Sequence, residues 1–165
     1  MLTPCVIRFI AANGQHQAHV HRRDHGHPEE VITNLSYLKG LVDSLGAEPV
    51  PGSVATKFVI LDSLWYAVWE IPRGELDGVL WEILLFPNRV TNQGESRFLR
   101  QHSVLDSTTP IEEVAFLYEV EQGKSDWQVK IGHNSESLDG PVDKVFQLVS
   151  WGFDGELSEA LSRFQ

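Results

Sequence analysis

Residues 19–31 read HVHRRDHGHPEEV, and this stretch joins an expected strand to the most regular helical pattern in the chain. Pro28 suits the first position of a helix, because a helix leaves the N–H of that position unpaired. Glu29 and Glu30 follow in the first turn, where the positive end of the helix dipole stabilises carboxylates. Apolar residues then recur at helical spacing: Val31, Leu35, Leu38, Val42 and Leu45. The sequence therefore predicts an amphipathic helix over 28–45 that docks through this stripe.

The residues before this helix predict a β-hairpin and a tight turn. Alternation of apolar and polar residues predicts a strand over 6–11, with Arg8 on its polar side. Asn13-Gly14 is a strong hairpin signal because both residues tolerate positive φ, and 17–23 is the expected returning strand. In the turn that follows, Gly26 is expected to need either room or a positive φ.

The rest of the chain predicts further helices and strands. Ser53 can cap a second helix, and a strand over 66–71 is the alternative for its last part because of the aromatic and β-branched content. Apolar spacing over 76–84 predicts a third helix. Further strands are expected over 98–104, 114–121, 126–132 and 142–151. Asp154 would cap a last helix that continues to Phe164.

These elements and the size of the chain predict one α+β domain. A chain of 165 residues fits a single domain over 1–165, and its hydrophobic share of 42% is that of a globular protein. Strands outnumber helices, and hairpins join several of them. We expect a mainly antiparallel β-sheet covered on one face by two to four helices.

The charge of the chain bears on its partners. The formal net charge is -10, and most of the excess acid lies in residues 104–165. An acidic surface repels phosphate backbones, so binding to nucleic acid would need a concentrated basic patch. The nearest approach to one is Arg8, Arg22 and Arg23, which we interpret as a solvated strand face. We therefore expect no nucleic-acid partner.

The single cysteine and the short apolar runs indicate a cytoplasmic protein. Cys5 has no second cysteine with which to form a disulfide inside the chain, which suits a reducing compartment. Residues 83–86 form one of the longest apolar runs, and they are far too few to span a bilayer. The first residues read as a strand and not as a secretory signal. We expect no membrane partner.

The histidines of the opening stretch are the leading candidates for chemistry. His19 and His21 lie two apart on an expected strand, so their imidazoles leave the same face about 7 Å apart at the backbone. Asp24, His25 and His27 could supply further ligands from the turn. Neutral imidazole and carboxylate suit Zn²⁺, Ni²⁺ or Fe²⁺, so these five residues form a hypothetical metal site. The alternative is a set of exposed polar side chains on the outer face of the hairpin.

Other catalytic patterns are weaker. Glu119 and Glu121 share one face of an expected strand, and Lys130 on the neighbouring strand can offset their charge. Acid–base work would need burial or proximity to separate their pKa values, so we interpret them as a solvated face. Nothing in the sequence brings a histidine to Cys5, and glycine-rich phosphate loops and nucleophile elbows are absent from the sequence.

The opening stretch also carries a resemblance. It is similar to the turn-to-helix motif, roughly YRHWDGYPEGV, of an uncharacterised family in prokaryotic and phage genomes. The matching residues are Arg22, Gly26, Pro28, Glu29 and Val31. The positions that depart from the motif are His21, Arg23, Asp24, His25 and His27. Residues 114–121 and 127–131 resemble that family's later hairpin, and 153–161 resemble its closing helix. The resemblance implies a fold but no activity, and the family does not share this histidine set.

Three classes of function follow from the sequence. The first is a non-catalytic interaction or accessory module for a protein partner, which the lack of catalytic motifs favours. The second is a metal-binding protein or metal-dependent enzyme that uses the histidine-rich turn over 19–27. The third is a small-molecule binder with an aromatic-lined pocket between sheet and helices. The sequence leaves the oligomeric state open.

Overall fold

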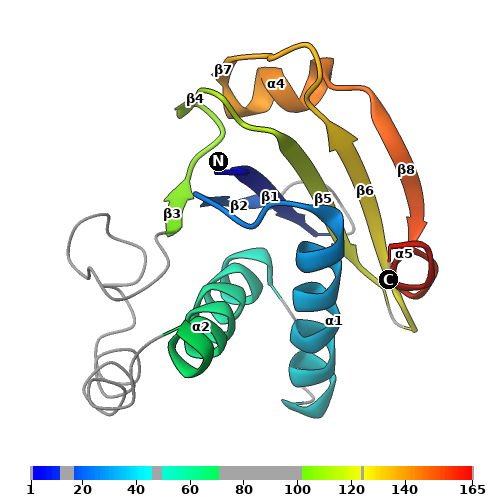
Figure 1. The fold of residues 1–165 in the computed structure, drawn as a ribbon. Coiled ribbons are helices and arrows are strands. Elements are labelled where there is room, and N and C mark those ends of the chain that lie inside the picture. Colours follow the sequence, from blue (N-terminus) through cyan, green and yellow to red (C-terminus); the bar gives the residue numbers. More distant parts are fainter. Residues whose placement is uncertain (1, 12–16, 46–49, 71–101, 124, 165) are drawn as a thin grey trace.

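A computed structural model describes the chain except for residues 1, 12–16, 46–49, 71–101, 124 and 165 (Figure 1). Its strands are β1 (Cys5–Ile10), β2 (Gln17–Arg22), β3 (His102–Leu105), β4 (Pro110–Ile111), β5 (Phe116–Gln122), β6 (Trp127–His133), β7 (Gly140–Pro141) and β8 (Trp151–Glu156). The described helices are α1 (Pro28–Leu45), α2 (Pro51–Glu70), α4 (Val142–Leu148) and α5 (Leu157–Arg163). None of these helices combines the length and the apolar character that crossing a membrane requires.

The predicted α+β architecture with a mainly antiparallel sheet is confirmed. Six strands form one sheet in the order β3-β2-β1-β5-β6-β8, and β4 and β7 form a separate pair. Neighbouring strands of the large sheet run antiparallel, except for β1 and β5, which are parallel. Because side chains alternate along each strand, the sheet presents two faces of different composition.

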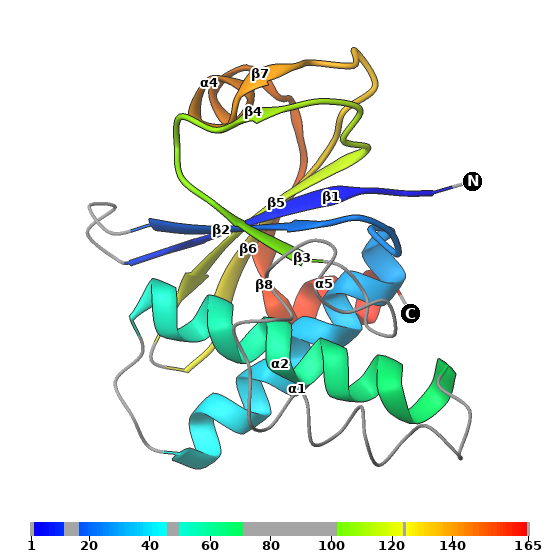
Figure 2. The ribbon, with the colours of Figure 1, turned by 90° about the vertical axis from the view of Figure 1, so that its left-hand side faces the viewer.

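The two faces of the sheet are covered by different elements. Figure 2 shows α1, α2 and α5 on one side, and α4 with the β4–β7 pair on the other. We call the first side the helical face and the second the outer face. Three helices therefore lie on one face, within the expected range of two to four, and α4 lies on the other.

The main core lies between the sheet and the helical face. Ile7 and Phe9 of β1 belong to one buried cluster with Leu35 and Leu38 of α1 and Phe58 of α2. The rings of Phe9 and Phe58 lie 5.9 Å apart between their centroids. The predicted helix over 28–45 is confirmed at both ends, and its apolar stripe is buried as expected from Val31 to Val42.

A second, smaller core lies on the outer face. Val6 and Leu117 of the sheet pack there with Val142, Val145 and Phe146 of α4. The strand expected over 142–151 is wrong, because these apolar residues repeat at helical spacing and need α4 to bury them. The β-branched residues of this segment favour a strand locally, but packing against the sheet stabilises the helix.

The last part of the chain corrects a second expectation. Asp154 lies inside β8 and caps no helix, since α5 begins only at Leu157. The start of α5 is held instead by Asp126, whose carboxylate accepts a hydrogen bond of 2.6 Å from the Ser158 hydroxyl. For the second helix, a strand over 66–71 was the alternative, and the structure shows that α2 continues as a helix to Glu70.

Some predictions fall outside the described residues. They include the third helix over 76–84, the Asn13-Gly14 turn and most of the strand over 98–104. The described part of that last region contains β3, which ends at Leu105.

The three arginines do not form a solvated strand face. Arg8 and Arg22 are 7% and 1% exposed, and they lie on opposite faces of the sheet. Arg22 donates hydrogen bonds to the Asn34 side chain at 2.9 Å and to the backbone oxygen of Asp24 at 3.1 Å. Burying a guanidinium is tolerated because such partners replace the lost water.

Candidate functional site

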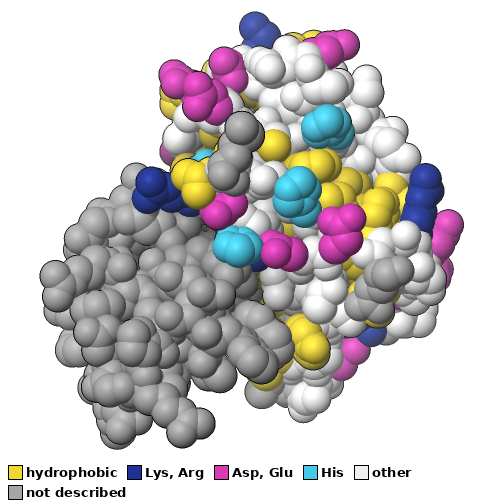
Figure 3. Space-filling model, in the orientation of Figure 1, with side chains coloured by type: hydrophobic (Ala, Val, Ile, Leu, Met, Phe, Trp, Pro, Cys, Tyr) yellow, Lys and Arg dark blue, Asp and Glu magenta, His cyan; other side chains and the backbone are white. Residues whose placement is uncertain are grey.

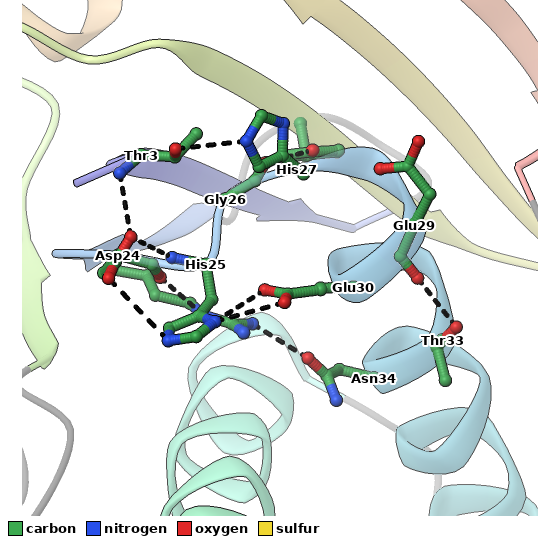
Figure 4. Close-up of polar contacts among 11 residues, drawn as sticks. Thr3, Asp24, His25, Gly26, His27, Glu29, Glu30, Thr33 and Asn34 are labelled. Carbon is green, nitrogen blue, oxygen red and sulfur yellow. Dashed lines mark hydrogen bonds and ion pairs between the residues drawn. The ribbon is translucent and has the colours of Figure 1, made fainter. Parts of the chain in front are cut away.

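The turn between β2 and α1 is built from backbone contacts with the start of β1 (Figure 4). The Asp24 carboxylate accepts hydrogen bonds from the backbone N–H of Thr3 at 2.8 Å and of His25 at 2.7 Å. Gly26 donates to the Thr3 oxygen at 2.8 Å, and its own oxygen accepts from the Tyr118 hydroxyl. Gly26 is needed for room, because a Cβ atom there would lie 2.6 Å from the Thr3 oxygen. The positive φ of the turn is at His25.

His25 contacts the first turn of α1, and His27 contacts the segment before β1. His25 Nδ1 lies 2.9 Å from Glu30 Oε2, and its Nε2 lies 3.7 Å from the Asp24 carboxylate. His27 Nε2 lies 3.2 Å from the Thr3 hydroxyl. His25 thus connects the turn to α1, and His27 connects it to Thr3, as Figure 4 shows.

His27 also belongs to a surface aromatic cluster. Its ring and that of His133 lie 5.5 and 4.9 Å from the ring of Phe116 between centroids. Figure 3 shows histidines beside apolar and acidic side chains on this side of the molecule. The two histidines contact an aromatic ring between them, which is a packing arrangement and not a chelating one.

His19 lies in a different environment, on the outer face beneath α4. It is 2% exposed, and its ring lies 5.9 Å from that of Phe146 between centroids. Its Nε2 accepts a hydrogen bond of 2.9 Å from Arg8 Nε. Burial, reinforced by the Arg8 charge, lowers the pKa of His19 to about 4. His19 is therefore neutral at pH 7, with its Nε2 lone pair already in use.

The structure brings the predicted metal ligands together only in pairs. No group of three or more His, Cys, Asp or Glu side chains within the described ranges is arranged to hold a metal ion. The predicted set was His19, His21, Asp24, His25 and His27. His19 and His21 leave the same face of β2, as expected, but α4 covers His19. Asp24, His25 and His27 lie in the turn, against Thr3 and Glu30.

A row of polar side chains crosses the outer face instead. The strand register places these residues side by side from β2 to β8: His19, Arg8, Glu119, Lys130 and Asp154. Opposite charges on directly paired residues attract each other across a sheet. The predicted pairing of Glu119 with Lys130 is confirmed, with Nζ and Oε1 3.8 Å apart.

Arg8 joins this row to α4. It donates a hydrogen bond of 2.9 Å to Asp143, and its guanidinium lies 3.6 Å from the Glu119 carboxylate. Its Cζ atom lies 4.1 Å from the ring centroid of Phe146. A planar guanidinium can make charge, hydrogen-bond and stacking contacts together, which a lysine cannot reproduce. Arg8 therefore holds α4 in place over one half of the outer face.

The other half of the outer face carries an open pocket of about 240 Å³. Its walls are Glu119, Glu121, Gln128, Lys130 and Asp154. Three carboxylates face one ammonium group here, so the pocket is acidic. It is the candidate functional site, and its chemistry suits a positively charged group.

The sequence showed part of this site. The alternation of apolar and polar residues predicted that Glu119 and Glu121 share one face, with Lys130 on the neighbouring strand. Asp154 was missed because the sequence assigned it to a helix cap. The contact of Arg8 with Glu119 was missed because the parallel pairing of β1 with β5 joins residues far apart in sequence. The alternation of apolar Phe153 with polar Asp154 was the sequence signal that could have predicted a strand there.

Comparison with models of known protein families, with curated proteins and with solved structures finds no match to this chain. The resemblance of the turn-to-helix stretch to a prokaryotic and phage family therefore stays a prediction.

Proposed function

We propose that this protein is a non-catalytic interaction module of the cytoplasm, which binds a positively charged segment of a partner protein on the outer face of its sheet. The proposal rests on the acidic pocket beside Arg8. This pocket is open to solvent, and its walls are residues of neighbouring strands in the sheet. Complementary charge mainly speeds association and selects the partner, and it contributes less to the affinity itself.

The charges around the pocket are unevenly compensated. Glu119 has both Arg8 and Lys130 within 4 Å. Within the described part of the chain, no ion pair engages Glu121 or Asp154. Both carboxylates line the pocket, where they can attract a cation from outside. The net charge of -10 favours the same class of partner and opposes nucleic acid.

Binding accounts for these residues better than catalysis does. Paired carboxylates act as acid and base when burial or mutual repulsion separates their pKa values. Glu119 instead pairs with two cations, Arg8 and Lys130, and not with a second carboxylate. The pocket has no aromatic side chain in its walls, so it differs from the aromatic pocket that the sequence suggested for a small-molecule ligand.

A fluorescein-labelled octalysine peptide tests this function. Fluorescence anisotropy should report binding at low ionic strength that weakens as salt is added, because exposed charges are screened. The double variant Glu121→Lys, Asp154→Lys should bind at least about tenfold more weakly, since two attractions become repulsions of similar size.

The matched control is Glu112→Lys, Glu136→Lys, which changes the net charge equally at exposed residues outside the pocket. Equal losses in the two double variants would mean that the peptide responds to net charge and not to the pocket. Wild-type protein that fails to bind the peptide would reject the proposed function.

A further inference from the structure

The acidic pocket lies beside an open edge of the sheet. β8 is the last strand in the order, and β6 is its one neighbour among the described strands. Figure 1 shows β8 along the outer border of the sheet, with no described segment beyond it. An edge strand offers a row of backbone N–H and C=O groups to which an extended peptide can add.

We propose that the partner's basic segment binds as an extended strand added to β8, with alternate side chains directed over the outer face toward the acidic pocket. This inference rests on the function proposed above and specifies the conformation of the partner and the backbone that receives it.

The side chains of β8 are arranged for such a strand. Phe153 is 5% exposed and belongs to the core of the helical face, whereas Asp154 and Glu156 are exposed. The register sets Asp154 beside Lys130 and Glu156 beside Gln128, so both lie on the outer face. Residues directly opposite on an added strand would have Cβ atoms about 4.5–5.5 Å from those of Asp154 and Glu156. A lysine or arginine there is long enough to reach the pocket.

The usable edge is short. The register with β6 is irregular between Ile131 and Gly132, next to Trp151. Bulges of this kind twist an edge and interrupt regular pairing. The regular part of β8 is therefore 153–156, which suits a brief contact aided by charge.

Charge selects the occupant of this edge. A second copy of the chain would bring the same acidic strand, and like charges placed opposite each other destabilise a strand pair. The whole chain, at -10, also repels its own copies. A basic segment gains from both the backbone groups and the carboxylates, so it is the occupant we propose.

Two labelled peptides test this inference. The first is an octapeptide of alternating lysine and threonine, and the second carries a methyl group on every backbone nitrogen. The charge is the same in both, but the second lacks backbone donors and cannot approach a strand edge. The first should bind, and the second should bind at least about tenfold more weakly.

Amide hydrogen exchange supplies the second readout. The unmethylated peptide should slow exchange of backbone amides in β8 that are not bonded to β6, and leave β3 at the opposite edge unchanged. Binding of both peptides with equal affinity, or binding without added protection in β8, would overturn strand addition while leaving the proposed function intact. Failure of the unmethylated peptide to bind would overturn strand addition, and failure of octalysine as well would reject the proposed function.

Discussion

The helical face and the outer face are built from the same strands, yet they differ in what covers them. On the helical face, α1, α2 and α5 close over an apolar cluster. On the outer face, α4 covers one half through Arg8 and Phe146, and the other half keeps charged residues around a pocket. One face is thus closed by an apolar core, whereas the other combines a smaller core with an open charged half.

The largest expected effect is on the helical face. Leu38 is fully buried, and Leu38→Ala should lower the free energy of unfolding by about 2–5 kcal/mol, because the lost methyl groups leave a cavity. Its neighbour Lys39 makes an exposed ion pair with Asp43, so Lys39→Ala should change stability by at most about 1 kcal/mol. Urea denaturation measures both, and equal midpoints would contradict the assigned helix phase.

The next effect is a pH dependence that arises at the covered half of the outer face. The folded-state pKa of His19 is about 4, below its ordinary 6.5, so the unfolded chain binds the proton more tightly. Neutral His19 therefore makes its whole contribution to the free energy of unfolding above pH 6.5. This contribution falls by about 3 kcal/mol in total as the pH drops toward 4. His19→Gln, which keeps an acceptor for Arg8, should remove this part of the slope. An unchanged slope between pH 6.5 and 4 would mean that His19 does not titrate as its burial implies.

A smaller effect is expected at the turn that joins the sheet to the helical face. Gly26→Val should cost about 1–3 kcal/mol, because its Cβ would meet the backbone oxygen of Thr3. Gly40 lies in α1, and a Cβ added there would meet no atom within 4 Å outside its own helix backbone, so Gly40→Ala should stabilise by about 0.5–1 kcal/mol. Thermal unfolding compares the two, and a tolerant Gly26→Val variant would contradict the close approach.

The smallest effect on stability is expected in the open half of the outer face. Glu121→Lys and Asp154→Lys should each lower the free energy of unfolding by at most about 1 kcal/mol, because neither side chain is buried. The larger loss is expected for Asp154→Lys, which places a lysine opposite Lys130. Denaturation by urea checks this. A loss as large as that of Leu38→Ala would show that the pocket residues serve the fold, and would remove the contrast between the two faces.

Local signals were sufficient for α1 and for the hairpin of β5 and β6. Pro28, the acidic first turn and a long apolar stripe define the helix within one segment. Alternation likewise set Glu119 against Lys130. Both features depend on residues that are close in the sequence, either within one helix or across one short hairpin loop. They can therefore be predicted from the sequence.

Long-range packing decided the rest. Residues 142–151 contain β-branched side chains in a short run, and only contact with the sheet selects the helix α4. The same helix buries His19, which the sequence predicted either as a metal ligand or as an exposed polar residue. The parallel pairing of β1 with β5 sets Arg8 beside Glu119, and no local pattern reveals a partner so far along the chain.

The central claim is that the open half of the outer face binds a basic partner. Residue-resolved NMR during titration with octalysine tests it most directly. Binding should shift backbone amide signals in β5, β6 and β8 around Glu121, Gln128 and Asp154, and leave those of α1 near Tyr37 unchanged. Shifts centred on α1, or spread evenly over the acidic surface, would contradict the claim.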